Sequence, residues 1–192
     1  MPTTPRHRDA IVRAAARLFR RQGYAATGLN EILAASGAPK GSLYHYFPGG
    51  KVQIGAEVVG LAGRLVSATL SDLAASAPRP SDVLRRYARM IVGWLEESDF
   101  RDGSPIATIL LELAPQERAV TAAGREAFAA YSDTLAGLLV AAGVAAGPAR
   151  RLALLAVCAL DGALVRARVE QDGSPVVEAL DQVADLFDAA AG

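Results

Sequence analysis

The sequence of 192 residues contains very little cysteine and histidine, and it has no long apolar run. With Cys158 as its one cysteine it cannot form an intrachain disulfide, which fits a reducing compartment, and two histidines argue against a histidine-rich metal site. The purest apolar run, Leu152–Leu160, is far shorter than the ~20 residues that cross a bilayer. The start of the chain is followed by an arginine-studded stretch rather than an apolar one. We therefore expect a cytoplasmic protein with neither a membrane span nor a secretory signal.

Motifs that carry catalysis or bind a cofactor are missing as well. The sequence has no Gly-rich phosphate loop and no Cys-x-x-Cys, and neither His7 nor His45 belongs to a Glu-x-x-His di-iron pattern. We therefore expect no metal, no cofactor and no enzymatic activity. An all-α enzyme remains the weakest of the hypotheses weighed below.

Strand-like alternation is also absent, and helical periodicity takes its place. Hydrophobic residues make up 52% of the chain and charged residues 21%, as in an ordinary globular protein. Apolar residues recur at helical spacing near both ends of the chain, for example at Ile11, Ala15, Leu18 and Phe19. Proline and glycine separate segments that are long enough for helices. The sequence therefore predicts an all-α fold of about nine helices.

The formal net charge of zero hides an uneven distribution along the chain. Residues 1–51 hold eight cationic side chains against Asp9 and Glu31, a net charge of +6, and residues 52–192 carry −6. Both lysines, Lys40 and Lys51, lie in the first segment. As a total, zero argues against a nucleic-acid partner, because phosphate contacts need Lys and Arg. Divided by segment, the charges indicate a nucleic-acid-facing domain on an acidic body, with a basic solvated face as the alternative.

The basic segment predicts three helices with short connections. The first covers about residues 6–22 and ends at Gly23. Thr27 is placed as the N-cap of a second helix over residues 28–35, and a tight turn at Ser36–Ala38 leads to a third that starts near Pro39. Two short helices joined by a glycine-containing turn form a helix-turn-helix. The second helix of that motif enters a major groove of DNA.

The side chains of the third helix suit this task. Lys40 can reach guanine or phosphate, Gly41 lets the backbone approach, and Ser42 can form a hydrogen bond. Donors and stacking surfaces come from Tyr44, His45 and Tyr46.

The stretch GYAATGLNEILAASGAPKGSLYHYFPGGK resembles the DNA-binding domain of TetR-type transcriptional regulators, and KGSLYHYF with the following lysine is its most specific part. The resemblance implies a DNA-binding domain over residues 1–51 and a helical effector-binding and dimerisation domain over residues 52–192. It implies that Thr27 caps the second helix and touches phosphate, and that Lys51 holds phosphate. The set of residues that it implies for DNA contact is Thr27, Lys40, Gly41, Ser42, Tyr44, His45, Tyr46 and Lys51.

The ending FPGGK, the later FRDGSPI and an acid in the helix that carries GALVRAR are similar to the LmrA and YxaF branch of that family. Members of this branch are drug- or small-molecule-responsive repressors. The resemblance therefore implies a homodimer that binds a palindromic operator in double-stranded DNA and is released by a small-molecule effector.

An effector site is expected among the helices of the acidic body. Its candidates are Met90, Trp94, Phe128, Tyr131, Cys158 and Asp161. Simple core packing is the alternative for the methionine and the aromatic residues. Asp161 is the sharper case, because an acid inside LAVCALDGALV must find a partner, face a cavity or bear a large desolvation cost. It could receive a cationic or hydroxylated effector, or it could bond to a neighbouring helix or to Tyr131.

The last two helices are expected to pair with those of a second subunit, as the resemblance implies. The candidate interface residues are Gly162, Ala163, Leu180, Val183, Ala184 and Phe187. Packing of the same stripe within one subunit is the alternative, which periodicity does not separate from the first. The leading hypothesis is thus a ligand-responsive repressor, and the second is a helical binding module with weak or architectural DNA contact.

Overall fold

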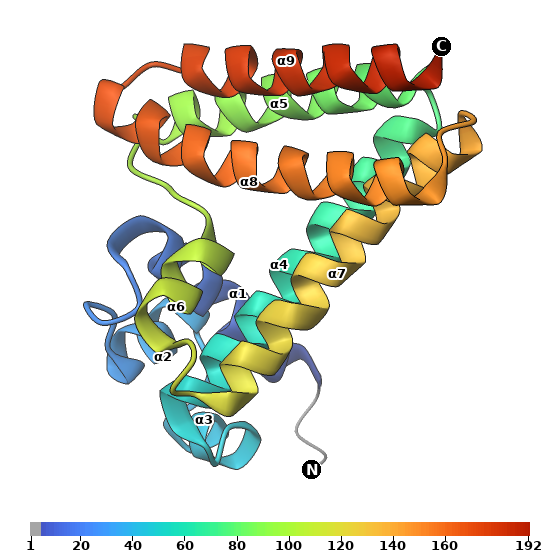
Figure 1. Cartoon of the computed structure of the whole chain (residues 1–192). Coiled ribbons are helices and arrows are strands. Elements are labelled where there is room, and N and C mark those ends of the chain that lie inside the picture. Colours follow the sequence, from blue (N-terminus) through green and yellow to red (C-terminus); the bar gives the residue numbers. More distant parts are fainter. Residues whose placement is uncertain (1–4) are drawn as a thin grey trace. The chain divides into compact units, whose positions relative to one another are not determined.

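The computed structural model describes residues 5–192, with side chains from residue 7 on, and in this range the chain is helical without strands (Figure 1). The predicted all-α fold class is confirmed. The helices are α1 (Pro5–Gln22), α2 (Leu29–Ser36), α3 (Lys40–Tyr46), α4 (Gly50–Ala74), α5 (Pro80–Glu97), α6 (Pro105–Leu113), α7 (Arg118–Ala141), α8 (Ala146–Glu170) and α9 (Ser174–Ala191).

Local signals in the sequence explain where these helices stop and start. Gly23 (φ +92°) and Gly37 (φ +65°) end α1 and α2 in the left-handed region, which costs glycine little. Ser104 caps α6, where its hydroxyl accepts a hydrogen bond from the amide of Ala107 at 3.2 Å.

The N-cap predicted for α2 is wrong. Gly28 occupies that position without a side-chain cap, and Thr27 lies one residue too early. The Thr27 hydroxyl instead donates to the carbonyl of Gly23 at 2.7 Å, inside the turn that joins α1 to α2.

The chain divides into two compact units. The first comprises residues up to Gly63 together with Ser104–Ala127, and the second comprises Arg64–Gly103 and Phe128–Gly192. Both units therefore share the long helices α4 and α7. These packing units differ from the predicted division between residues 51 and 52. That division concerns DNA binding and effector binding rather than packing, and it stays a prediction.

The first unit is built on α1, which packs against α2, α3 and α6. Phe19, Ile32 and Phe47 are fully buried in its core, and the ring centroids of Phe19 and Tyr24 lie 5.1 Å apart. At the end of this unit α4 and α7 run side by side (Figure 1). A Cβ atom on Gly63 would come within 2.6 Å of the Cβ of Ala127, so this close crossing requires glycine.

The second unit packs α9 against both α5 and α8. An ionic cluster ties α5 to α9: Arg85 contacts Asp185 at 2.6 Å and Asp188 at 3.3 Å, and Ser81 donates to Asp188 at 2.6 Å. The hydrogen bond from Ser81 and the arginines nearby hold the pKa of Asp188 below its usual value. In α8, Arg168 donates to the carbonyl of Arg101 and fixes the loop ahead of α6.

Of the described helices, α4 alone is long and apolar enough to cross a membrane. Its Ile54, Val58, Val59 and Leu70 are at most 2% exposed in the packed units. A single helix of this length and composition does not by itself indicate a membrane span, because globular proteins contain such helices as well.

Candidate nucleic-acid interface

The helix-turn-helix presents α3 as a short helix with one buried side and one exposed side. Leu43 is 2% exposed and Phe47, directly after the helix, is fully buried, so these two side chains fix α3 on the core of the first unit. On the other side Lys40, Tyr44 and His45 are exposed, and Tyr44 keeps 70% of its surface open to solvent. A large exposed aromatic side chain beside a cation offers stacking and hydrogen-bonding groups to a ligand.

Gly41 lies on the exposed side of α3 and has no intramolecular reason to be glycine. A Cβ atom built there meets nothing within 4 Å, and its φ lies outside the left-handed region. Glycine disfavours a helix by up to about 1 kcal/mol relative to alanine. The absence of a side chain therefore keeps the outer surface of α3 open.

Two residues of the predicted DNA-contacting set are buried. Thr27 is 1% exposed with its hydroxyl engaged by Gly23, and Ser42 is 7% exposed, so neither side chain has a free surface for a phosphate or a base. Packing of α3 turns Ser42 inward together with Leu43. Sequence periodicity placed only Leu43 in the core.

Lys51 lies at the start of α4, against the turn between α1 and α2. Its ammonium group donates to the carbonyl of Ala25 at 3.3 Å and lies 4.2 Å from the centroid of the Tyr24 ring, a cation–π contact. Partial burial lowers the pKa of Lys51, while Glu112 opposes this shift. Lys51 is thus held in place on the surface of the first unit.

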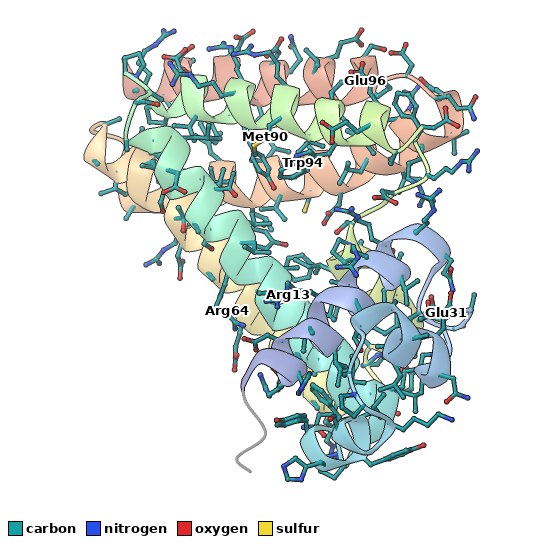
Figure 2. All side chains as sticks on the ribbon, turned by 180° about the vertical axis from the view of Figure 1, so that it is seen from behind. Arg13, Glu31, Arg64, Met90, Trp94 and Glu96 are labelled. Carbon is teal, nitrogen blue, oxygen red and sulfur yellow. The ribbon has the colours of Figure 1, made fainter. Side chains whose placement is uncertain are left out.

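Three other cations of the first segment differ in how they are engaged. Arg8 is ion-paired with Glu57, and its guanidinium group lies 5.7 Å from the centroid of the Phe47 ring. Lys40 is exposed and makes no ion pair or hydrogen bond with the described residues. Arg13, labelled on α1 in Figure 2, is also exposed. Lys40 therefore offers an unpaired charge on the exposed side of α3.

The candidate effector residues lie in the second unit, and their exposure varies widely. Tyr131 is 7% exposed and its ring packs edge-on against Phe128 at 5.7 Å, whereas Trp94 is 46% exposed and Cys158 is exposed. Met90 is half-buried; it and Trp94 lie along the edge of α5 that is turned away from α9 in Figure 2.

Asp161 is half-buried on α8 and makes no hydrogen bond or ion pair with the described residues. Burial raises the pKa of this carboxyl group. Tyr87, which is 5% exposed, has its pKa raised to about 12 by burial and by Asp161, and the pKa of Tyr131 is raised by the same two causes. The sequence analysis missed Tyr87, although it lies three residues before Met90 at helical spacing.

Most of the residues expected at a dimer interface are buried within the chain. Leu180, Val183, Ala184 and Phe187 are between 0 and 4% exposed, and Ala163 is 6% exposed. This corrects their expected role, because α5 and α8 already cover the apolar stripe of α9. Gly162 differs: it is exposed, and a Cβ atom there would meet nothing within 4 Å.

Besides the stripe on α9, an apolar stripe that the sequence analysis did not single out lies on α8, and it remains uncovered. We call it the α8 stripe. It consists of Leu154, Leu155, Cys158, Gly162, Val165 and Val169, which recur every three or four residues and are all exposed.

A basic unit that holds a short, exposed helix on a helix-turn-helix core is the architecture of a DNA-binding transcriptional regulator. Comparison with known proteins agrees. Residues 11–58 match the family model of bacterial regulatory proteins of the tetR family, and residues 80–183 match the C-terminal domain of LmrA/YxaF-like transcriptional regulators. The chain belongs to the TetR family of transcriptional regulators, in its LmrA/YxaF-like branch, and the resemblance seen in the sequence is confirmed.

Relatives match the chain over nearly its whole length. The HTH-type transcriptional regulator Rv0196 of Mycobacterium tuberculosis is 36% identical over 174 residues, 88% of each chain. The HTH-type regulator LmrA of Bacillus subtilis is 26% identical and covers 94% of this chain and 96% of its own. The crystal structure of a regulatory protein TetR from Rhodobacter sphaeroides superposes with a TM-score of 0.80 at 23% identity, over 93% of this chain and 97% of that one, and supports the fold.

Proposed function

We propose that the protein is a homodimeric, cytoplasmic repressor that binds a palindromic DNA operator and releases it when a small-molecule effector binds. The observation that carries this proposal is α3, whose inner side chains are buried while Lys40, Gly41 and Tyr44 form an open outer surface. The division of charge along the chain supports it, because phosphate binding needs the cations of residues 1–51 and the acidic remainder is repelled by DNA.

In this proposal the residues of α3 divide between base edges and phosphates. Lys40, at the N-terminus of α3, approaches a guanine edge or a phosphate, and Gly41 lets the backbone come close. Tyr44, His45 and Tyr46 supply hydrogen bonds and stacking, with the rings of His45 and Tyr46 edge-on at 5.0 Å. Lys51 binds phosphate. Thr27 and Ser42 are left out of this set because they are buried.

The homodimer is proposed to form through the α8 stripe. An exposed apolar stripe of this length is costly in water and is typical of a surface covered by a partner. Gly162 supports the idea, since nothing inside the chain requires a glycine there and a second helix could approach closely at that position. Two subunits present two copies of α3, which read half-sites about 34–36 Å apart.

The effector is proposed to bind in the second unit near Asp161, Tyr87 and Tyr131, with Met90, Trp94 and Phe128 as apolar neighbours. Asp161 lacks a partner although burial disfavours its charge, and neither tyrosine hydroxyl is hydrogen-bonded to a described residue. A cationic or hydroxylated ligand would supply these missing interactions. Cys158 remains in this set only through its position three residues before Asp161.

Release follows if the effector binds better to a conformation that does not fit the operator. The two binding events are then reciprocally coupled, typically by about 1–3 kcal/mol. Neither site needs to touch the other for this effect.

Footprinting on the DNA that flanks the protein's own gene tests the proposal. We expect protection of a palindrome by the wild-type protein and a sharp loss of affinity with rising salt. Diffuse protection without sequence preference would instead support the binding module with architectural DNA contact. A small-molecule thermal-shift screen then searches for ligands that raise the melting temperature and reverse the protection.

A further inference from the structure

Glu112, at the exposed end of α6, makes two hydrogen bonds to the turn that precedes the helix-turn-helix. Its two carboxylate oxygens accept from the backbone amide of Tyr24 at 2.9 Å and from that of Ala25 at 2.7 Å. These residues are separated from Glu112 by 88 and 87 positions in the sequence. Hydrogen bonds to a carboxylate are about twice as strong as neutral ones.

The same turn is also held by Lys51, through the carbonyl of Ala25 and the ring of Tyr24. Gly23 permits this arrangement, because its φ of +92° lies in a region that residues with a side chain rarely adopt. Beyond the turn the chain enters α2 with no side-chain cap. Within the turn the Thr27 hydroxyl and amide bond to the carbonyls of Gly23 and Tyr24, and groups from α4 and α6 add the contacts that join the turn to the rest of the unit.

We infer that Glu112 is a positioning residue of the DNA-binding unit, which fixes the turn before α2, and with it Lys51, in the arrangement that reads the operator. This inference rests on the proposed operator binding. The anchors of α6, Ile106 and Ile109, are at most 5% exposed, so the carboxylate is carried by a firmly packed helix. An acidic side chain repels phosphate, so the role of Glu112 is not itself a contact with DNA.

The sign of the effect on DNA affinity separates this role from simple electrostatics. Replacing an acid by a neutral residue in a DNA-binding unit strengthens binding to any DNA, because it removes repulsion from phosphates. Losing the positioning role weakens binding to the preferred sequence. Glu112→Gln therefore gives opposite results in the two cases, and Glu126→Gln is the matched control. Glu126 lies exposed on α7 in the same unit and makes no hydrogen bond or ion pair with the described residues.

The experiment uses the full chain, a duplex that the wild-type protein selects from randomised DNA, and a scrambled duplex of the same composition. For Glu112→Gln we expect the Kd for the selected duplex to rise about tenfold, equivalent to about 1.4 kcal/mol. The Kd for the scrambled duplex should stay level or fall, as it should for Glu126→Gln on both duplexes. If Glu112→Gln binds the selected duplex as tightly as the control does, the inference is wrong.

Amide hydrogen exchange provides a test that needs no operator. We expect the amides of Tyr24 and Ala25, which lie outside the helices, to be protected in the wild-type protein and to exchange faster in Glu112→Gln. Unprotected amides in the wild-type protein would overturn the inference. If no duplex is selected, the proposed function fails, and the exchange data still decide whether Glu112 holds the turn.

A second variant guards against a substitution that simply unfolds the protein. Glu112→Asp keeps the charge, but its carboxylate is one methylene shorter and should not reach both amides. We expect it to lose affinity for the selected duplex and to leave binding to the scrambled duplex unchanged. Equal affinity of Glu112→Asp and wild type for the selected duplex, with both amides still protected, would mean that bidentate positioning is not required.

Discussion

The ammonium group of Lys51 lies 4.2 Å from the centroid of the Tyr24 ring and 3.3 Å from the carbonyl oxygen of Ala25. A cation on a long side chain is thereby restrained at the start of α4, and less conformational entropy is lost if it then binds a phosphate. Lys40 has no such restraint. The two lysines of the chain should therefore contribute differently to DNA binding.

Lys51→Ala is expected to weaken binding about equally for all DNA sequences and to lower the salt slope of log K by about one, because one phosphate contact is lost. Lys40→Ala should in addition relax the preference for one base, at a cost of about 1–3 kcal/mol. Fluorescence anisotropy on the preferred duplex and its single-base variants at several salt concentrations measures both effects. Identical base preferences in the two variants would remove Lys40 from base recognition.

Gly41→Ala should separate stability from DNA binding. The added methyl group meets nothing within 4 Å and alanine favours a helix, so we expect unchanged or higher stability, by up to about 1 kcal/mol. Affinity for the operator should nevertheless fall, because the methyl group stands between α3 and the groove. Urea unfolding and gel shifts of the same preparation compare the two properties. Wild-type affinity in this variant would show that the backbone does not approach DNA at this position.

Val165→Arg should break the homodimer without unfolding the chain. Val165 is 62% exposed in the α8 stripe, so an arginine disturbs no intrachain packing but introduces a charge where a partner helix is proposed. Sedimentation should show a monomer with weakened operator binding. The control is Val140→Arg on α7, where the side chain is 47% exposed outside the stripe. A Val165→Arg protein that sediments as a dimer, like its control, would place the interface elsewhere.

Asp161→Asn should stabilise the free protein and impair its response to a cationic effector. Burial raises the pKa of Asp161 in the folded chain, so the ionised carboxylate disfavours folding. The resulting loss in the free energy of unfolding is greatest above the raised pKa. At pH 7 the variant avoids this loss, and we expect a higher melting temperature that converges with wild type as the pH falls through the raised pKa towards about 3.9. Differential scanning calorimetry between pH 7 and pH 4 follows the convergence.

The same variant tests the proposed effector chemistry. A cationic ligand found by the thermal-shift screen should raise the melting temperature of wild type more than that of Asp161→Asn. Equal shifts in the two proteins would mean that the ligand does not contact Asp161.

Much of this protein is determined by short-range properties of its sequence. Glycine at Gly23 and Gly37 ends two helices, proline opens α5 and α6, and the cations gathered before residue 52 mark the nucleic-acid-facing segment. These signals depend on backbone conformation and charge within a few residues. They were therefore sufficient for the fold class, for the helix-turn-helix and for the exposed Lys40, Gly41 and Tyr44.

Other features were decided only by tertiary structure, because periodicity shows that a helix has an apolar face but not what covers it. The stripe of α9 is covered by its own chain, whereas the α8 stripe is left open. Thr27 and Ser42 have polar side chains suited to DNA, but packing turns both inward. The contact of Glu112 with Tyr24 joins residues 88 positions apart, and only the fold brings such partners together.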